Sequence, residues 1–139
     1  MIVYTDASVR LRIILGDGPT LADWETWTTI FSSAISAVEA RRTLDRLRLT
    51  GGLTDRTLAE AVVKLLAIEA ATTGFPVTPE VLERASQPLG TVVRTLDAIH
   101  VASALLLRES GYDLVFATHD RQQALAARAL GFGVIGVEP

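Results

Sequence analysis

The chain has 139 residues, of which 49% are apolar and 21% charged, and this balance is that of one globular domain rather than of a disordered segment. A formal net charge of −3 argues against a protein that binds nucleic acid through an overall positive charge. The same charge is compatible with a nuclease whose acidic cluster binds cations. The absence of cysteine excludes disulfides and thiolate metal sites. Because the sequence has neither a signal-peptide pattern nor an apolar run of about 18 residues, we expect a soluble, cytoplasmic protein without membrane contact, with 1–139 as one domain.

Strand-like and helix-like segments alternate along the chain. Short apolar or β-branched runs are typical of buried strands, and longer segments between glycine or proline clusters are typical of helices. The expected strands cover 2–5, 28–32, 74–78, 114–117 and 133–137, and the expected helices cover 7–15, 21–27, 36–49, 54–72, 79–87, 95–110 and 120–130. This alternation predicts an α/β sandwich of three layers, with a mainly parallel central sheet flanked by helices.

Three aspartates lie at expected junctions between strands and helices. Asp6 directly follows the first strand, Asp120 follows the strand 114–117, and Asp97 begins a helix that is apolar on nearly every side. Ligands of such sheets bind outside the carboxyl ends of the strands, which favours a functional site here. Aspartate is also among the best N-cap residues, so each of the three, taken alone, is better explained as a helix cap than as a catalytic residue.

Other polar residues have local explanations. Ser36 and Glu39 have the spacing of a capping box, and Glu39 could instead pair with Arg42 on the same helix. His100, on an apolar helix, is expected to be a core residue with satisfied hydrogen bonds, and His119 to lie in a turn. No serine stands in a visible arrangement with histidine and an acid, so nucleophilic serine catalysis has no support.

Several segments, taken in order, resemble the PIN domain family, and specifically the VapC-type toxins of bacterial toxin–antitoxin pairs. The segments are 3–8 (VYTDAS), 33–41 (SAISAVEAR), 75–78 (FPVT), 96–105 (LDAIHVASAL) and 116–121 (FATHDR). The ordered set covers nearly the whole chain and is more specific than any of its parts. The resemblance implies a PIN-like fold and a metal-dependent endoribonuclease that cleaves RNA.

The same resemblance assigns roles to individual residues. Asp6 and Asp97 would be direct ligands of Mg²⁺ or Mn²⁺, which prefer oxygen ligands, while Glu39 and Asp120 would bind directly or through water. Ser8 and Thr118 would hold these carboxylates in place. Arg121 would contact RNA phosphate.

The resemblance also implies partners: a cognate antitoxin whose segment blocks the acidic site, and a second copy in a homodimer. The apolar excess of 54–72 suits such surfaces, although burial of that helix explains it equally well. Three alternatives remain open. A receiver domain would need a lysine near the last strand, but the chain's only lysine is Lys64. An aspartyl-phosphate phosphatase would need an acid at Ser8, and a non-catalytic PIN-like module that binds RNA or protein would not need the four acids.

Overall fold

The computed structural model describes residues 1–16, 18, 21 and 23–138. Five strands form one sheet in the order β3-β2-β1-β4-β5, and every neighbouring pair is parallel, as the alternation of elements predicts. The strands are β1 (Ile2–Thr5), β2 (Thr29–Ser33), β3 (Thr73–Phe75), β4 (Leu114–Ala117) and β5 (Gly133–Ile135). The helices are α1 (Ala7–Leu15), the 3₁₀ turn η1 (Trp24–Thr26), α2 (Ile35–Leu49), α3 (Asp55–Ala71), α4 (Pro79–Ala85), α5 (Thr95–Glu109) and α6 (Arg121–Ala129).

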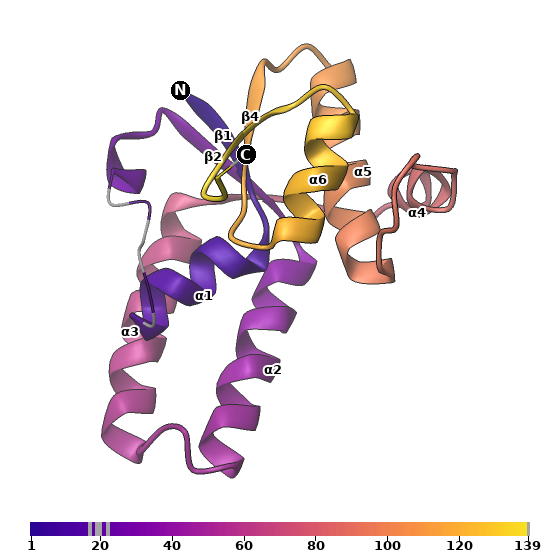
Figure 1. Ribbon diagram of the computed structural model, residues 1–139. Coiled ribbons are helices and arrows are strands. Elements are labelled where there is room, and N and C mark those ends of the chain that lie inside the picture. Colours follow the sequence, from indigo (N-terminus) through magenta and orange to yellow (C-terminus); the bar gives the residue numbers. More distant parts are fainter. Residues whose placement is uncertain (17, 19–20, 22, 139) are drawn as a thin grey trace.

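Helices cover both faces of the sheet (Figure 1). Alternate residues of a strand point to opposite faces, so Tyr4 packs with α5 and α6, whereas Val3 packs with α1 and Trp27. The helix α5 is buried on nearly all sides, as predicted: nine of its 15 residues are buried, and it packs against the sheet, α4 and α6. The sheet and α5 therefore form the rigid centre of the molecule.

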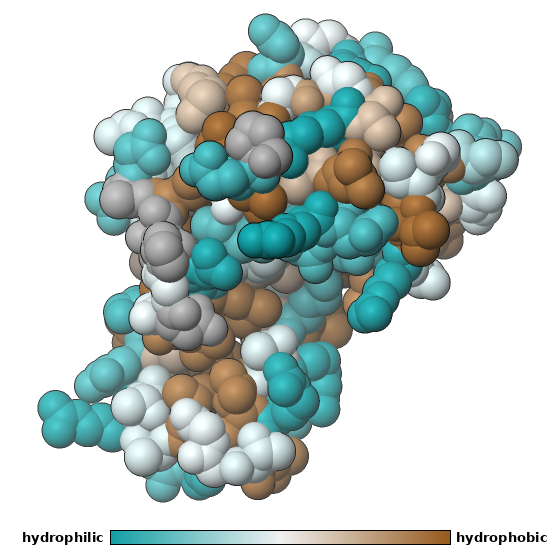
Figure 2. Space-filling view, in the orientation of Figure 1, coloured by the Kyte–Doolittle hydropathy of each residue, from teal (hydrophilic) through white to brown (hydrophobic). Residues whose placement is uncertain are grey.

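The helices α2 and α3 extend together away from the sheet (Figure 1). Their inner faces, with part of α1, form a second apolar cluster around Ile14, Leu44 and Leu65. Glu69 of α3 ties the three helices together, because it forms ion pairs with both Arg41 of α2 and the buried Arg10 of α1. In Figure 2 the far end of this pair forms a lobe with mixed hydrophobic and hydrophilic surface. No helix in the described part of the chain is long and apolar enough to cross a membrane.

The structure corrects several local predictions. Ser36 does not cap α2, whose N-cap residue is Ala34 without a side-chain hydrogen bond; the Ser36 hydroxyl is buried and lies 2.6 Å from the hydroxyl of Ser32. The expected helix at 21–27 is only the short turn Trp24–Thr26, with Ala22 outside the described residues. The strand expected at 28–32 is shifted by one residue, and the last strand ends at Ile135.

Candidate active site

Four acidic side chains meet at the carboxyl edge of the sheet. The strand order reverses direction between β1 and β4, and the crevice outside such a point is where open α/β sheets bind ligands. Asp6 follows β1 and Asp120 follows β4. Glu39 lies early in α2, which leaves the same edge, and Asp97 lies in the first turn of α5. The helix α5 directly precedes β4, which is parallel to its neighbours, so α5 runs opposite to the strands and its first turn lies at their carboxyl edge.

These side chains share one pocket of about 200 Å³. Its lining consists of Asp6, Ala7, Ser8, Leu11, Glu39, Asp97, His100 and Asp120. The four acids that the sequence singles out therefore converge, although their positions in the chain span more than 100 residues. Whether they act as metal ligands or in catalysis stays a prediction.

Asp6 is the most firmly held of the four. It is 4% exposed, and its Oδ1 accepts hydrogen bonds from the backbone N–H and the hydroxyl of Ser8. The hydroxyl of Thr118 donates to its Oδ2 at 2.5 Å. Asp6 is also the N-cap of α1, so the sequence-based expectation of a cap is confirmed. Both carboxylate oxygens are thus fixed in direction by partners from two different elements.

Glu39 is positioned by a buried histidine rather than by its own helix. Its Oε1 lies 2.6 Å from Nε2 of His100, which is 1% exposed, and Nδ1 of His100 lies 2.8 Å from the Tyr4 hydroxyl. The backbone N–H of Ser33 donates to that hydroxyl oxygen, so the Tyr4 hydrogen is available for Nδ1 and the Nε2 proton for Glu39. Burial raises the pKa of Tyr4 well above its ordinary value, which keeps the phenol a donor.

Asp120 and Asp97 are held differently. Asp120 is the N-cap of α6, and its Oδ1 accepts from the backbone N–H of Gln123 at 2.9 Å. The side chain of Gln123 in turn donates to the backbone carbonyl of Asp97 at 3.2 Å, which connects the two elements. Asp97 does not cap α5, because the N-cap residue is Arg94; within the described residues its carboxylate accepts no hydrogen bond. The capping explanation of Asp97 is therefore wrong.

The carboxylates disfavour one another's charge. The pKa of Asp97 is raised above its usual value, first by burial and then by the negative charges of Asp120, Asp6 and Glu39. The pKa of Asp6 is also raised by burial, although His100 and the hydroxyls of Ser8 and Thr118 oppose the shift. A cation in the pocket would reverse this balance, because it favours the ionised form of every acid around it.

The donor set fits a hard divalent ion by its chemistry. Mg²⁺ and Mn²⁺ prefer oxygen ligands, often use only one or two carboxylates, and complete their shell with water. Among the described residues, no group of three or more His, Asp or Glu side chains is arranged so that it could hold a metal ion. The pocket thus supplies oxygen ligands around a common space rather than a finished coordination shell.

A family model described as the PIN domain matches residues 3–129, which is most of the chain. The chain belongs to the PIN domain family. The crystal structure of PAE2754 from Pyrobaculum aerophilum is similar in fold, with a TM-score of 0.66 at 20% identity over 96% of this chain and 83% of that one. No curated protein matches this chain.

The PIN domain is a nuclease-type fold. The strand order of this chain, 3-2-1-4-5, differs from the order 2-1-3-4-5 of receiver domains and excludes that alternative.

The remaining predicted residues of this PIN domain lie at different distances from the pocket. Ser8 and Thr118 do contact Asp6, and Thr118 also accepts from the backbone N–H of Asp120. His119 lies in the turn after β4, as expected, with Nδ1 at 3.0 Å from the Gly136 carbonyl oxygen. Arg121 is the exposed first residue of α6 and is not among the residues that line the pocket. Its contact with RNA stays a prediction.

Sequence reasoning missed the link from Tyr4 through His100 to Glu39. One signal was present in the sequence: Tyr4 stands two residues before Asp6. Because residues two apart in a strand point to the same face, the Tyr4 hydroxyl is directed to the face of the sheet on which Asp6 lies. His100 is one helical turn after Asp97 and faces the same way. What the sequence could not indicate is that Glu39, 61 residues from His100, completes the chain of hydrogen bonds.

We expect Tyr4→Phe to lower the free energy of unfolding by about 2 kcal/mol. The substitution leaves the buried N–H of Ser33 without its acceptor and Nδ1 of His100 without its donor, and an unpaired buried polar group costs roughly 1–3 kcal/mol. Urea unfolding measures the change. Tyr112→Phe is the matched control, because the Tyr112 side chain is 42% exposed. Equal stability of the two variants would show that the buried hydroxyl contributes little.

Proposed function

We propose that this PIN domain is a Mg²⁺- or Mn²⁺-dependent endoribonuclease that hydrolyses RNA phosphodiester bonds. The observation that carries the proposal is the single pocket that Asp6, Glu39, Asp97 and Asp120 line, in which burial and then the neighbouring acids raise the pKa of Asp97. A pocket of mutually repelling carboxylates at the carboxyl edge of a nuclease-type fold is suited to attract cations and, with them, a phosphate.

In this mechanism Asp6 and Asp97 would hold the cation directly, and Glu39 and Asp120 would bind it directly or through water. A bound divalent ion would supply positive charge against the phosphate and lower the pKa of a water molecule bound to it, so that more hydroxide is available at neutral pH. The protein's own contribution is orientation: Ser8 and Thr118 fix the oxygens of Asp6, and His100 fixes Glu39. Asp97 receives no such restraint from the described residues, so its carboxylate is free to turn toward a ligand.

By its resemblance to VapC-type toxins, we further propose that the nuclease is a toxin that a cognate antitoxin inhibits by occupying the acidic pocket. A homodimer belongs to the same proposal. The exposed apolar side chains of α3, namely Val62, Val63 and Leu66, support a protein-binding surface on that helix.

The test is cleavage of total RNA by the purified protein with Mg²⁺, with Mn²⁺ and with excess EDTA. We expect cleavage with either ion, loss of cleavage in EDTA and recovery when the ion is restored in excess. Cleavage that EDTA leaves unchanged would contradict the metal-dependent mechanism. A protein that binds RNA but never cuts it with either ion would favour the alternative, a non-catalytic PIN-like module.

A further inference from the structure

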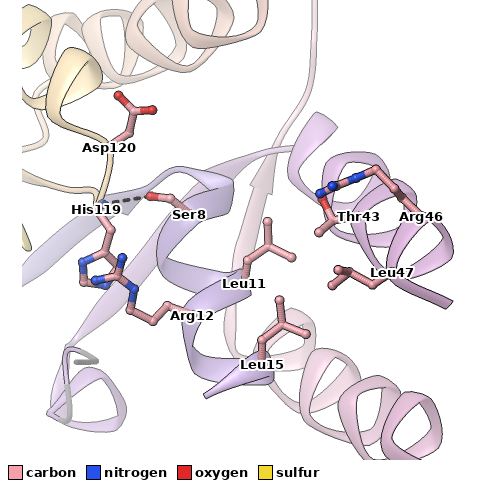
Figure 3. A pocket seen from close by; sticks show the side chains of 9 residues that line it. All are labelled: Ser8, Leu11, Arg12, Leu15, Thr43, Arg46, Leu47, His119 and Asp120. Atoms are coloured by element: carbon pink, nitrogen blue, oxygen red, sulfur yellow. Dashed lines mark hydrogen bonds between the residues drawn. The ribbon is translucent and has the colours of Figure 1, made fainter. Parts of the chain in front are cut away.

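A second pocket, of about 340 Å³, opens beside the acidic one (Figure 3). Its lining consists of Ser8, Leu11, Arg12, Leu15, Thr43, Arg46, Leu47, His119 and Asp120. Ser8, Leu11 and Asp120 also line the acidic pocket, so the two spaces adjoin along one wall. A linear polymer with one monomer bound at the carboxylates would therefore have its next monomer within reach of the second pocket.

The second pocket combines an apolar lining with positive charge. In Figure 3, Leu11 and Leu15 extend from α1 toward Thr43 and Leu47 of α2. Arg46, on the exposed side of α2, has no ion pair with any acid in the part of the chain that the structure describes. Arg46 therefore adds positive charge to one side of a pocket that Asp120 also lines.

The surface of α2 continues beyond Arg46 with Arg42, whose guanidinium is ion-paired with Asp45 at 3.0 Å, so Arg46 is the unpaired cation of this stretch among the described residues. A further hollow is lined by Arg42, Thr43, Arg46, Leu49 and Thr50, and it shares Thr43 and Arg46 with the second pocket. The carboxylates, the apolar pocket and this hollow thus form one track in which the charge changes sign. Such a track complements a polyanion with apolar units: a phosphate beside Arg46, and a flat apolar group between the leucines.

We propose that the second pocket binds the nucleotide adjacent to the scissile phosphodiester of single-stranded RNA. The base packs between the leucines of α1 and α2, and Arg46 pairs with the flanking phosphate. The pocket has the volume of a small-ligand site, and a base can enter it only when it is unstacked, since a duplex hides its bases. The inference rests on the proposed function, because it assumes that the scissile phosphate lies at the carboxylates.

The test measures RNA binding by fluorescence anisotropy in EDTA and in an Asp97→Asn background, which together suppress the expected cleavage, and the substitution also reduces the negative charge of the acidic pocket. The probes are a labelled ten-nucleotide single strand of mixed sequence, the same RNA as a duplex, and a ten-unit abasic backbone. Arg46→Ala is compared with Arg56→Ala, which removes the same charge from an exposed position on α3 that lines none of the three spaces.

We expect Arg46→Ala to raise the Kd for the single strand about five- to tenfold and to reduce its salt slope by about 0.7, the value for one phosphate contact. Arg56→Ala should change the Kd less than twofold, and the duplex should bind weakly to every variant. Leu47→Ala should weaken binding of the RNA but not of the abasic backbone. Equal effects of the two arginine variants, or equal effects of Leu47→Ala on RNA and abasic backbone, would overturn the assignment.

Failure of the inference is distinguishable from failure of the proposed function. If the wild-type protein cleaves RNA in an EDTA-sensitive way while Arg46→Ala binds like Arg56→Ala, only the nucleotide pocket is refuted. If the wild-type protein never cleaves but Arg46→Ala and Leu47→Ala weaken binding as expected, the pocket stands as an RNA site and the nuclease activity is refuted.

Discussion

Asp97→Asn is expected to reduce the rate of RNA cleavage by on the order of 10²–10³-fold while making the protein more stable in the absence of divalent ions. The rate falls because Asp97 would hold the divalent ion that stabilises charge at the phosphate, and the loss of one such electrostatic contribution costs about 10²–10³-fold. Stability rises because the pKa of Asp97 is raised by burial and by three neighbouring acids, so its ionised form is disfavoured at neutral pH. Removing that charge should raise the melting temperature by about 3 °C, or ~1 kcal/mol.

The cleavage rate is expected to fall while the melting temperature rises. A variant that lost activity by misfolding would instead melt at a lower temperature, so the two measurements separate these causes. Thermal melting in EDTA and cleavage in Mg²⁺ are measured on the same preparations, together with Asp113→Asn, which alters an exposed aspartate away from the pocket. The control should match the wild type in both measurements. An Asp97→Asn protein that melts lower than the wild type in EDTA would contradict the electrostatic account, and one that cleaves normally would remove Asp97 from the site.

The pH dependence of this effect has a definite sign. A carboxyl group whose folded-state pKa is raised destabilises the folded protein at pH values above its unfolded value. The advantage of Asp97→Asn over the wild type should therefore be largest near neutral pH and disappear as the pH falls below the ordinary range of aspartate.

Gly136→Ala is expected to destabilise the protein by about 3–4 kcal/mol and to remove cleavage activity. A Cβ atom at position 136 would lie 2.3 Å from the carbonyl oxygen of Thr118. The backbone at this position has φ +99°, a value that residues other than glycine rarely adopt. Relief of this contact would displace Thr118, whose hydroxyl binds Asp6 and accepts from the backbone N–H of Asp120. The glycine therefore protects the positions of two acids without contacting either of them.

Gly111→Ala is the matched control for this substitution. Gly111 has φ +106°, and a Cβ atom there would meet nothing within 4 Å, so only backbone strain of roughly 1–2 kcal/mol applies. Urea unfolding of the two variants isolates the cost of the contact with Thr118 as their difference. If the two variants are equally destabilised, or if Gly136→Ala keeps the cleavage rate of the wild type after correction for the folded fraction, Thr118 is not held in place by this glycine.

The helix α1 and the strand β4 have the boundaries that the sequence predicts, because each begins or ends at a strong local signal. Gly16 stops α1 with a positive φ, and Asp6 and Asp120 cap their helices as aspartates at such junctions commonly do. Local rules failed at Ser36, where capping-box spacing suggested a helix start, but the hydroxyl pairs with Ser32 inside the fold. A contact with a residue of another element outweighed the local preference.

Glu39 and Asp97 show the limit of sequence reasoning most clearly. Glu39 has acceptable partners on its own helix, yet its actual partner is His100 of α5, from which α3, β3 and α4 separate it along the chain. Asp97 stands near the start of its helix, where a capping residue is expected, yet the N-cap residue is Arg94. The carboxylate of Asp97 lines the acidic pocket instead. Periodicity describes only neighbours along the chain, so it cannot distinguish a cap from a ligand.

The sequence by itself determined the α/β fold, the order of the elements and the three aspartates at junctions of strands and helices, because alternation, turn residues and strand ends are local properties; Glu39 joined them only through the resemblance to the PIN family. Only the tertiary structure decided that these acids share one pocket, that Tyr4 and His100 orient Glu39, and that an arginine-lined apolar pocket adjoins the carboxylates. The physical reason is the parallel sheet: it brings the ends of β1, β2 and β4 and the start of α5 to one edge, although long stretches of chain separate them.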